Sequence, residues 1–322
     1  MAKATSITHS RAIVENKIID RAKLGRLTDL KLKPSTTVRY CNAIMNLISW
    51  MTAMGQEWPV EKLVWIDALE QYAEHLWEEG RPLGDLGDVL SGLPHFEKGL
   101  RGHLQDVWKL YGVWKMHEIP TRAVPFSVNV LLAMVGLALK EGDNKMAAAY
   151  LLGFQALLRT GELCSILVKD VTFNKSFTKL VVNLCLTKGG RRRGCEETTT
   201  TTDKATICFL RIAFSSLKKG DSLIGRSSQA FRKDFARHLI ALALQHVGYK
   251  PYSLRRGGAT TAIQETGNLG LVALTGRWQN QATARIYIND GLKVFAETSF
   301  SADSVAKVQA AGKIALSIIS II

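Results

Sequence analysis

The sequence predicts a mainly α-helical chain with one small antiparallel β-sheet, an α+β fold in two domains. Apolar residues recur at helical spacing along most of the 322 residues, a length typical of about two domains of roughly 150 residues each. The spacing changes over residues 163–173 and 179–186, which are rich in β-branched residues and partly alternate, with turn residues between them. Residues 118–126 contain two prolines and no periodicity, so we place a linker between the domains there.

The N-terminal half is predicted to be a basic arm over residues 1–34 followed by a helical domain over residues 35–117. Apolar spacing predicts three helices in this domain, over residues 35–54, 61–79 and 99–115. Ser35 is the expected N-cap of the first helix, and a glycine-rich stretch separates the second from the third. Six of the seven tryptophans lie here, a concentration more typical of a core than of a binding surface.

The C-terminal half, residues 127–322, is predicted to be mostly helical around the small sheet. Five consecutive threonines at residues 198–202 extend the β-prone region. Helical spacing lies on both sides of it, over residues 127–139, 145–158, 227–247, 253–266, 269–276 and 280–289.

The chain is strongly basic, with a formal net charge of +14 and a pI of about 9.6. A hydrophobic fraction of 47% is too high for a disordered chain. A protein this basic usually meets a polyanion, most often nucleic acid, although the charge alone fits a solvated surface equally well.

The five cysteines predict neither a disulfide framework nor a zinc site, because their number is odd and no CxxC pair occurs. This usage fits a reducing compartment, and the first residues lack the apolar core of a signal peptide. The apolar run over residues 314–322 would span about 14 Å as a helix, less than half of a bilayer core. We therefore expect neither secretion nor a membrane anchor.

Two polar groups in the middle of the chain stand out. Arg159 and Glu162, in Leu-Leu-Arg-Thr-Gly-Glu-Leu, share a face at the end of an apolar helix, and alone they would be read as a surface ion pair. Lys188 lies in Leu-Thr-Lys-Gly-Gly-Arg-Arg-Arg-Gly, which follows a strand and predicts a hairpin tip with four cations. Such a tip suits a DNA groove or phosphate, or simply a solubilising turn.

A third group lies near the C-terminal end. Tyr252 and Arg255 are three residues apart, and Arg256 precedes the pair Gly257-Gly258 in a helical pattern. Each glycine costs about 1 kcal/mol against alanine there, which indicates close packing or close approach to a backbone. Gly-Arg-Trp follows at residues 276–278, and a tyrosine stands nine residues beyond the tryptophan.

In order, Arg-x-x-Glu-Leu, a hairpin lysine, Leu-Arg-Arg-Gly-Gly-Ala-Thr and Gly-Arg-Trp followed by tyrosine resemble the tyrosine recombinase family, also called the phage integrases. The resemblance covers about residues 127–290. It implies that residues 35–117 are the helical core-binding domain, which contacts DNA, and that residues 127–322 are the catalytic domain with a C-terminal docking tail.

The resemblance also implies roles for single residues. Arg159 and Arg255 match the two phosphate-binding arginines, and Tyr287 matches the nucleophile. Lys188 matches the hairpin lysine, and Trp278 stands where the family has histidine or tryptophan. Tyr252 departs from the pattern, because most members have histidine there, and a phenol that titrates near pH 10 is a poor proton shuttle at neutral pH. Glu162 is a supporting residue, and the expected DNA contacts are Arg191, Arg192, Arg193, Arg256 and Arg277.

Elementary chemistry agrees with these roles. Two guanidiniums can neutralise the non-bridging oxygens of a phosphodiester and the charge that gathers in the transition state. A lysine on a hairpin can protonate the leaving 5′-oxygen. The tyrosine ester keeps the free energy of the broken bond, so we expect no cofactor and no obligatory metal.

The function implied by the resemblance is a site-specific DNA recombinase or integrase from a mobile element, which works through a 3′-phosphotyrosine. Its partners would be double-stranded DNA and three further copies in a homotetramer on paired sites, inside the cell where DNA lies. The alternatives are a DNA-binding derivative that no longer cleaves, a DNA-relaxing enzyme of the type IB topoisomerase kind, and a helical scaffold. The apolar tail would dock either on its own domain or on a neighbouring protomer.

Overall fold

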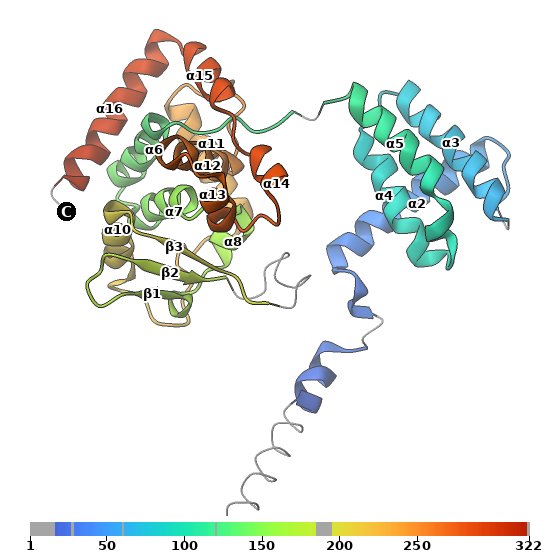
Figure 1. Cartoon of the computed structure of the whole chain (residues 1–322), viewed down its shortest axis with the longest axis horizontal. Helices are drawn as coiled ribbons and strands as arrows, with labels where there is room; N and C mark the ends of the chain where they lie inside the picture. Colours follow the sequence, from blue (N-terminus) through green and yellow to red (C-terminus); the bar gives the residue numbers. More distant parts are fainter. Residues whose placement is uncertain (1–16, 27–28, 60, 120, 185–194, 321–322) are drawn as a thin grey trace, which may run out of the picture. The chain divides into compact units, whose positions relative to one another are not determined.

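The computed structural model describes residues 17–26, 29–59, 61–119, 121–184 and 195–320. It divides the chain into two compact units, Met1–Thr121 and Arg122–Ile322 (Figure 1). Most of the described residues are helical, and one three-stranded antiparallel sheet is present among them, so the predicted mainly α, α+β fold class is confirmed. Within the described ranges, no helix combines the length and the apolarity needed to cross a bilayer.

The first unit is a helical bundle. Its elements are a 3₁₀ turn at Asp29–Lys31, α2 at Pro34–Ala53, α3 at Lys62–Glu78, α4 at Leu83–Phe96, a 3₁₀ turn at Leu100–His103 and α5 at Gln105–His117. Ser35 is not the N-cap of α2, because Lys33 holds that position and Pro34 begins the helix. Proline suits the first turn, where its missing N–H would have had no helical partner.

The glycine-rich stretch is a helix, contrary to the prediction. In α4 the apolar residues Leu86, Val89, Leu90 and Leu93 lie on one buried face, and burial of that face outweighs the cost of the glycines. Gly92 is needed for the packing, since a Cβ atom there would lie 2.9 Å from the Cβ of Tyr40 in α2.

The tryptophans of this unit fulfil the prediction of a core in part. Trp65 and Trp114 are buried, and they pack with the apolar residues of α3, α4 and α5. Three others, Trp58, Trp77 and Trp108, are about 40% exposed and lie at the edge of the core. Composition therefore located the core of the unit but not the side of each helix that forms it.

The second unit carries the sheet and most of the helices. Its elements are α6 at Val128–Lys140, α7 at Asn144–Gln155, α8 at Thr160–Ser165, a 3₁₀ turn at Val168–Asp170, β1 at Val171–Phe173, β2 at Leu180–Asn183, β3 at Thr198–Thr201, α10 at Lys204–Phe214, α11 at Ser228–Ala241, α12 at Tyr252–Thr266, α13 at Leu269–Gly276, α14 at Gln281–Arg285, α15 at Asp290–Thr298 and α16 at Ala302–Ile319. The strands follow the order β1-β2-β3, with Val181 opposite Thr172 on one side and Thr200 on the other.

The structure differs from the prediction at several elements of this unit. Residues 163–173 form a strand only at β1, because α8 and a 3₁₀ turn occupy the rest. The helix predicted over residues 280–289 ends at Arg285. Helices α10, α15 and α16 had not been predicted at all.

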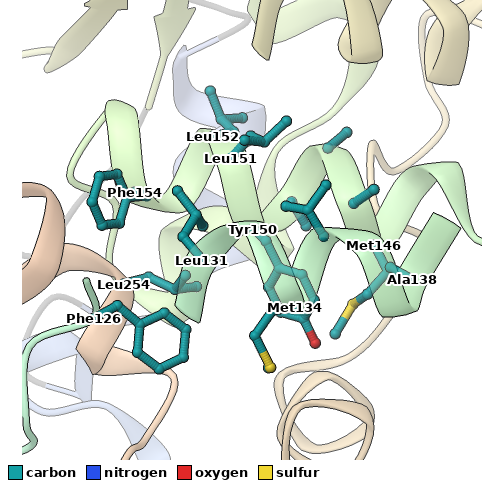
Figure 2. Packing of buried hydrophobic residues seen from close by; sticks show 14 of the residues in the cluster. Phe126, Leu131, Met134, Ala138, Met146, Tyr150, Leu151, Leu152, Phe154 and Leu254 are labelled. Atoms are coloured by element: carbon teal, nitrogen blue, oxygen red, sulfur yellow. The ribbon is translucent and has the colours of Figure 1, made fainter. Parts of the chain in front are cut away.

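Helix α7 is the centre of the second core. Every residue from Met146 to Phe154 is buried, as expected for a helix that is surrounded on all sides. Figure 2 shows Tyr150 beside Met134 of α6, and Leu254 of α12 beside Phe126. The start of α12, which carries Tyr252 and Arg255, is thereby tied to the core.

The pair Gly257-Gly258 lets α12 approach two other backbone segments, as the sequence indicated. A Cβ atom on Gly257 would lie 2.3 Å from the carbonyl oxygen of Phe126, and one on Gly258 would lie 2.0 Å from that of Phe154. Any larger side chain at these positions would push α12 away and would displace Arg255 with it.

The C-terminal tail packs on its own unit. Helix α16 runs along α6, and the contact is so close that a Cβ atom on Gly136 would lie 1.9 Å from the carbonyl oxygen of Ala311 (Figure 1). The Ser304 hydroxyl donates to the carbonyl of Ala243 at 3.0 Å. Ala311 and Ala315 are buried in this contact, whereas Leu316 of the apolar run is 51% exposed.

Candidate active site

Two tyrosine hydroxyls meet in the second unit. Tyr252 begins α12, and Tyr287 lies in the turn that follows α14. Their hydroxyl oxygens are 2.7 Å apart, and Tyr252 donates the hydrogen bond. The Trp278 ring packs against the Tyr287 ring, with 4.5 Å between the ring centroids. Tyr287, the predicted nucleophile, therefore packs against the Trp278 ring and is hydrogen-bonded to the Tyr252 hydroxyl.

Arg255 lies under this group of rings. Its guanidinium carbon is 4.7 Å from the centroid of Trp278 and 5.5 Å from that of Tyr287. The side chain is 0% exposed, and it donates to the carbonyl oxygens of Leu157 at 2.5 Å and Gly276 at 2.6 Å. The buried Nε of Arg255 finds no partner among the described residues. Arg255 thus joins α12 to the turn at Leu157 and to the C-terminal end of α13, and its Nε remains available to a ligand.

Arg159 and Glu162 form the predicted pair at the start of α8, not at the end of the preceding helix. Arg159 is the N-cap of α8, and its NH1 donates to Glu162 at 2.5 Å. The Arg159 side chain is 36% exposed, whereas that of Glu162 is 10% exposed. Glu162 also accepts from the backbone N–H of Arg159 at 2.9 Å, so the carboxylate fixes the arginine that stays accessible to a ligand.

Glu162 connects three arginines. Besides Arg159, it accepts from NH2 of Arg277 at 2.7 Å and lies 3.9 Å from NH1 of Arg255. Burial raises the pKa of the Glu162 carboxyl, but the charges of Arg277 and Arg159 outweigh it, and the pKa falls below its ordinary value. The carboxylate therefore stays ionised and holds the arginines in one cluster.

Arg256 and Arg277, which were predicted to contact DNA, both have side chains buried against groups of their own chain. Arg256 is buried, and its NH1 donates to the carbonyl of Ile286 at 2.9 Å, next to Tyr287. The Arg277 side chain is 5% exposed and lies between Glu162 and the buried Glu197. Both guanidiniums are used to brace the protein, because burial without such partners would cost far more than it returns.

The structural role of Arg277 can be tested by measuring how a substitution there changes the stability of the protein. Arg277→Gln would leave two buried carboxylates without their shared cation, and we expect it to destabilise the protein by about 3 kcal/mol or more. Arg237→Gln is the matched control, because Arg237 pairs with Glu141 while its side chain is 52% exposed. Exposed pairs contribute about 0.2–1 kcal/mol. Thermal unfolding of both variants measures the difference, and equal losses would contradict the bracing role.

Two contributors to the cluster were missed in the sequence. Leu157 has a φ of 49°, a left-handed conformation that is costly for leucine, and its carbonyl accepts from Arg255 and Arg277. No local pattern indicates this turn. Glu197 did carry a signal, because it precedes the alternating threonines and shares the buried side of the strand with Thr199 and Thr201.

The ionisation of the two phenols is unequal. Burial raises the pKa of Tyr252, and its hydrogen bond to Tyr287 raises it further. Burial also acts to raise the pKa of Tyr287, but the hydrogen bonds from Tyr252 and Trp278 and the charges of Arg255 and Arg159 outweigh it, so that pKa is lowered. Arg255 itself has a pKa lowered to about 10, by burial and by the charges of Arg159 and Arg277. Negative charge in this group is therefore favoured on the Tyr287 oxygen.

Four predicted site residues, Lys188, Arg191, Arg192 and Arg193, lie outside the described residues. The same is true of residues 1–16 of the predicted basic arm. The strands β2 and β3, which flank residues 185–194, are antiparallel partners, and Asn183 pairs with Thr198. Across the described ranges, no group of three or more His, Cys, Asp or Glu side chains could hold a metal ion.

No family model matches this chain, and no curated protein sequence matches it significantly. Its structure, in contrast, is similar to several solved structures. A Tn1549 transposon integrase in complex with transposon right end DNA is 12% identical over 84% of this chain and 94% of that chain, with a TM-score of 0.57. A lambda integrase dimer bound to a COC′ core site is 17% identical over 88% and 77%, with a TM-score of 0.55.

A third structure, the XerH site-specific recombinase bound to its difH substrate, is 13% identical over 81% of this chain and 78% of that chain, with a TM-score of 0.52. These proteins are recombinases and integrases. At such low identities the likeness establishes the fold, so the chain has the tyrosine recombinase fold.

Proposed function

We propose that this chain cleaves and rejoins DNA as a site-specific recombinase or integrase, through a 3′-phosphotyrosine formed by Tyr287. The observation that carries the proposal is the group of Tyr287, Tyr252, Trp278 and Arg255, assembled from three separate segments of the chain. The fold adds support, because its structural neighbours are recombinases and integrases bound to DNA.

The donors around Tyr287 suit a phosphodiester. The indole N–H of Trp278 acts on the Tyr287 oxygen, whereas the buried Nε of Arg255 has no hydrogen-bond partner among the described residues. A bound phosphate oxygen would supply one, and an unsatisfied buried donor otherwise costs about 1–3 kcal/mol. Arg159 adds an accessible guanidinium. Together these groups would offset the negative charge of the phosphate, which otherwise repels the attacking oxygen.

The segment that carries Tyr287 is held by its own chain. Arg256 binds the carbonyl of Ile286, and the N–H of Asn289 donates to the Thr260 hydroxyl at 3.2 Å. The Gln264 side chain donates to Asp290 at 2.7 Å. Three ties to α12 thus flank the tyrosine, and in our proposal the nucleophile attacks the phosphate bound by the arginines of the same chain.

The remaining parts of the proposal rest on the sequence. Lys188 would protonate the leaving 5′-oxygen. A homotetramer on paired sites, an origin in a mobile element and a place inside the cell beside DNA follow from the resemblance to the integrases. A transposon integrase among the structural neighbours supports the mobile-element origin.

A covalent-adduct assay tests the proposal. The protein is incubated with pooled duplexes that carry a nick near the cleavage position, so that a short strand diffuses away and rejoining is blocked. We expect a protein–DNA band that survives denaturation, and peptide mapping that assigns the link to Tyr287. A link at another residue, or no adduct on any duplex that the protein binds, would contradict it.

A second candidate function is a DNA-binding protein that no longer cleaves. The observation in its favour is Tyr252, a phenol at a position where the family has histidine. The same assay separates the two functions. Site-specific binding without any adduct would support the derivative, whereas an adduct at Tyr287 would exclude it.

A further inference from the structure

Tyr252 is placed to act on Tyr287. Its ring is tilted against that of Tyr287, with 5.7 Å between the centroids, and its hydroxyl is 2.7 Å from the Tyr287 oxygen. Both rings are partly buried. Tyr252 stands one helical turn before Arg255, whose side chain is locked to two carbonyls, so the position of the phenol is set by the buried end of α12.

The different environments of the two phenols decide which hydroxyl donates. Either phenol could donate in principle, since a hydroxyl proton rotates freely. The cation of Arg255 lies against the rings of Tyr287 and Trp278, and it acts to lower the pKa of both phenols. Burial outweighs this effect at Tyr252, whose pKa is raised, but not at Tyr287. Because the two pKa values move in opposite directions, Tyr252 stays protonated when Tyr287 ionises. Tyr252 is therefore the donor and Tyr287 the acceptor.

We propose that Tyr252 is a positioning residue whose hydroxyl holds the Tyr287 oxygen in place and stabilises it as the attacking phenolate. This inference rests on the proposed function and deepens it. It gives the departure from histidine a physical meaning: the site replaces a group that can exchange protons with one that donates a permanent hydrogen bond.

The step balances without a proton acceptor on Tyr252. Tyr287 loses its proton to water or hydroxide, and its oxygen then donates an electron pair to phosphorus. The bond from Tyr287 to phosphorus forms while the bond from phosphorus to the 5′-oxygen breaks. That leaving oxygen takes a proton from the ammonium group of Lys188, the acid of the proposed function. The Tyr252 proton stays on Tyr252 throughout.

The first test measures the ionisation of Tyr287 without DNA. NMR of isotope-labelled tyrosine follows the titration of each phenol in the full-length protein, and Tyr287→Phe identifies the signal of Tyr287 by its loss. We expect Tyr252→Phe to move the titration of Tyr287 to higher pH. Tyr249→Phe is the matched control, because the buried Tyr249 hydroxyl has no hydrogen-bond partner among the described residues. An unchanged titration in Tyr252→Phe would overturn the inference.

The second test measures adduct formation against pH. We expect Tyr252→Phe to lose about tenfold at neutral pH, since a hydrogen bond to a charged group contributes more than one between neutral groups. The loss should close at high pH, where Tyr287 ionises without help, and Tyr249→Phe should follow the wild type. A uniform loss at every pH would indicate a merely structural role and would overturn the inference.

The two tests keep the inference and the proposed function apart. A shifted titration in a protein that never forms an adduct would uphold the phenol pair and overturn the recombinase function. An adduct at Tyr287 with an unshifted titration and an unshifted pH profile would uphold the function and overturn the role of Tyr252. Loss of the adduct at all pH values in Tyr252→Phe, with Tyr287 titrating as in the wild type, would instead make Tyr252 the candidate nucleophile.

Discussion

Tyr287→Phe is expected to abolish the covalent DNA adduct completely while leaving the fold and DNA binding intact. The substitution removes one oxygen and keeps the ring, which retains its contacts with Trp278 and Arg255. It also leaves the Tyr252 hydroxyl without its acceptor, which should cost about 1 kcal/mol of stability and no more. Denaturing gels measure the adduct, and thermal unfolding and DNA affinity measure the rest.

The control for this variant is the conservative change at Tyr249, which also removes a buried hydroxyl. Tyr249→Phe should keep both adduct and affinity. If Tyr287→Phe formed adduct as efficiently as the wild type, Tyr287 would not be the nucleophile, and the neighbouring Tyr252 would be the next residue to map.

Arg159→Lys and Arg255→Lys are each expected to slow cleavage at least about a hundredfold, roughly 2.7 kcal/mol of barrier, because lysine keeps the charge but loses the forked donors. Their effects on stability should differ. Arg255 is fully buried and donates to two carbonyls, which a lysine cannot both reach, so Arg255→Lys should also lower the unfolding temperature. Arg159 is partly exposed, and Arg159→Lys should unfold close to the wild type.

Single-turnover cleavage on a nicked duplex and thermal unfolding measure the two effects separately. Near-intact DNA binding is expected for Arg159→Lys, since most of the affinity comes from charge. Cleavage at the wild-type rate in either variant would remove that arginine from the site. Equal stability of the two variants would contradict the structural role assigned to Arg255.

Local sequence signals were sufficient where residues at the ends of a helix, such as an N-cap or a glycine after the last turn, mark its boundaries. Residues 269–276 were predicted as a helix and form α13 with those bounds, because Asn268 caps its first turn. Gly80 follows α3 with a φ of 64°, as expected for a glycine after a helix end. The glycine pair in α12 indicated a close backbone approach, since no side chain could account for its cost.

Local signals failed where packing outweighed propensity. The glycines of α4 suggested a loop, but burial of one leucine-rich face made a helix. The β-branched residues near 163–173 suggested a strand, but the capping of α8 by Arg159 and Glu162 turned the first part into a helix. The tail has a helical spacing that the prediction did not use, with Val308, Ala311 and Ala315 on one buried face, and α16 packs along α6 because small residues allow close contact.

The sequence by itself determined the fold class and proposed the residues of the site, because the order and spacing of Arg159, Arg255, Trp278 and Tyr287 can be read along one dimension. Only the tertiary structure decided what each cation does. Arg255, Arg256 and Arg277 are indistinguishable as letters, yet burial makes all three partners of carbonyls and carboxylates, while Arg159 stays accessible. The 2.7 Å contact between Tyr252 and Tyr287 joins residues far apart in the chain, and no spacing rule contains it, since it depends on how α12 and the turn after α14 pack together.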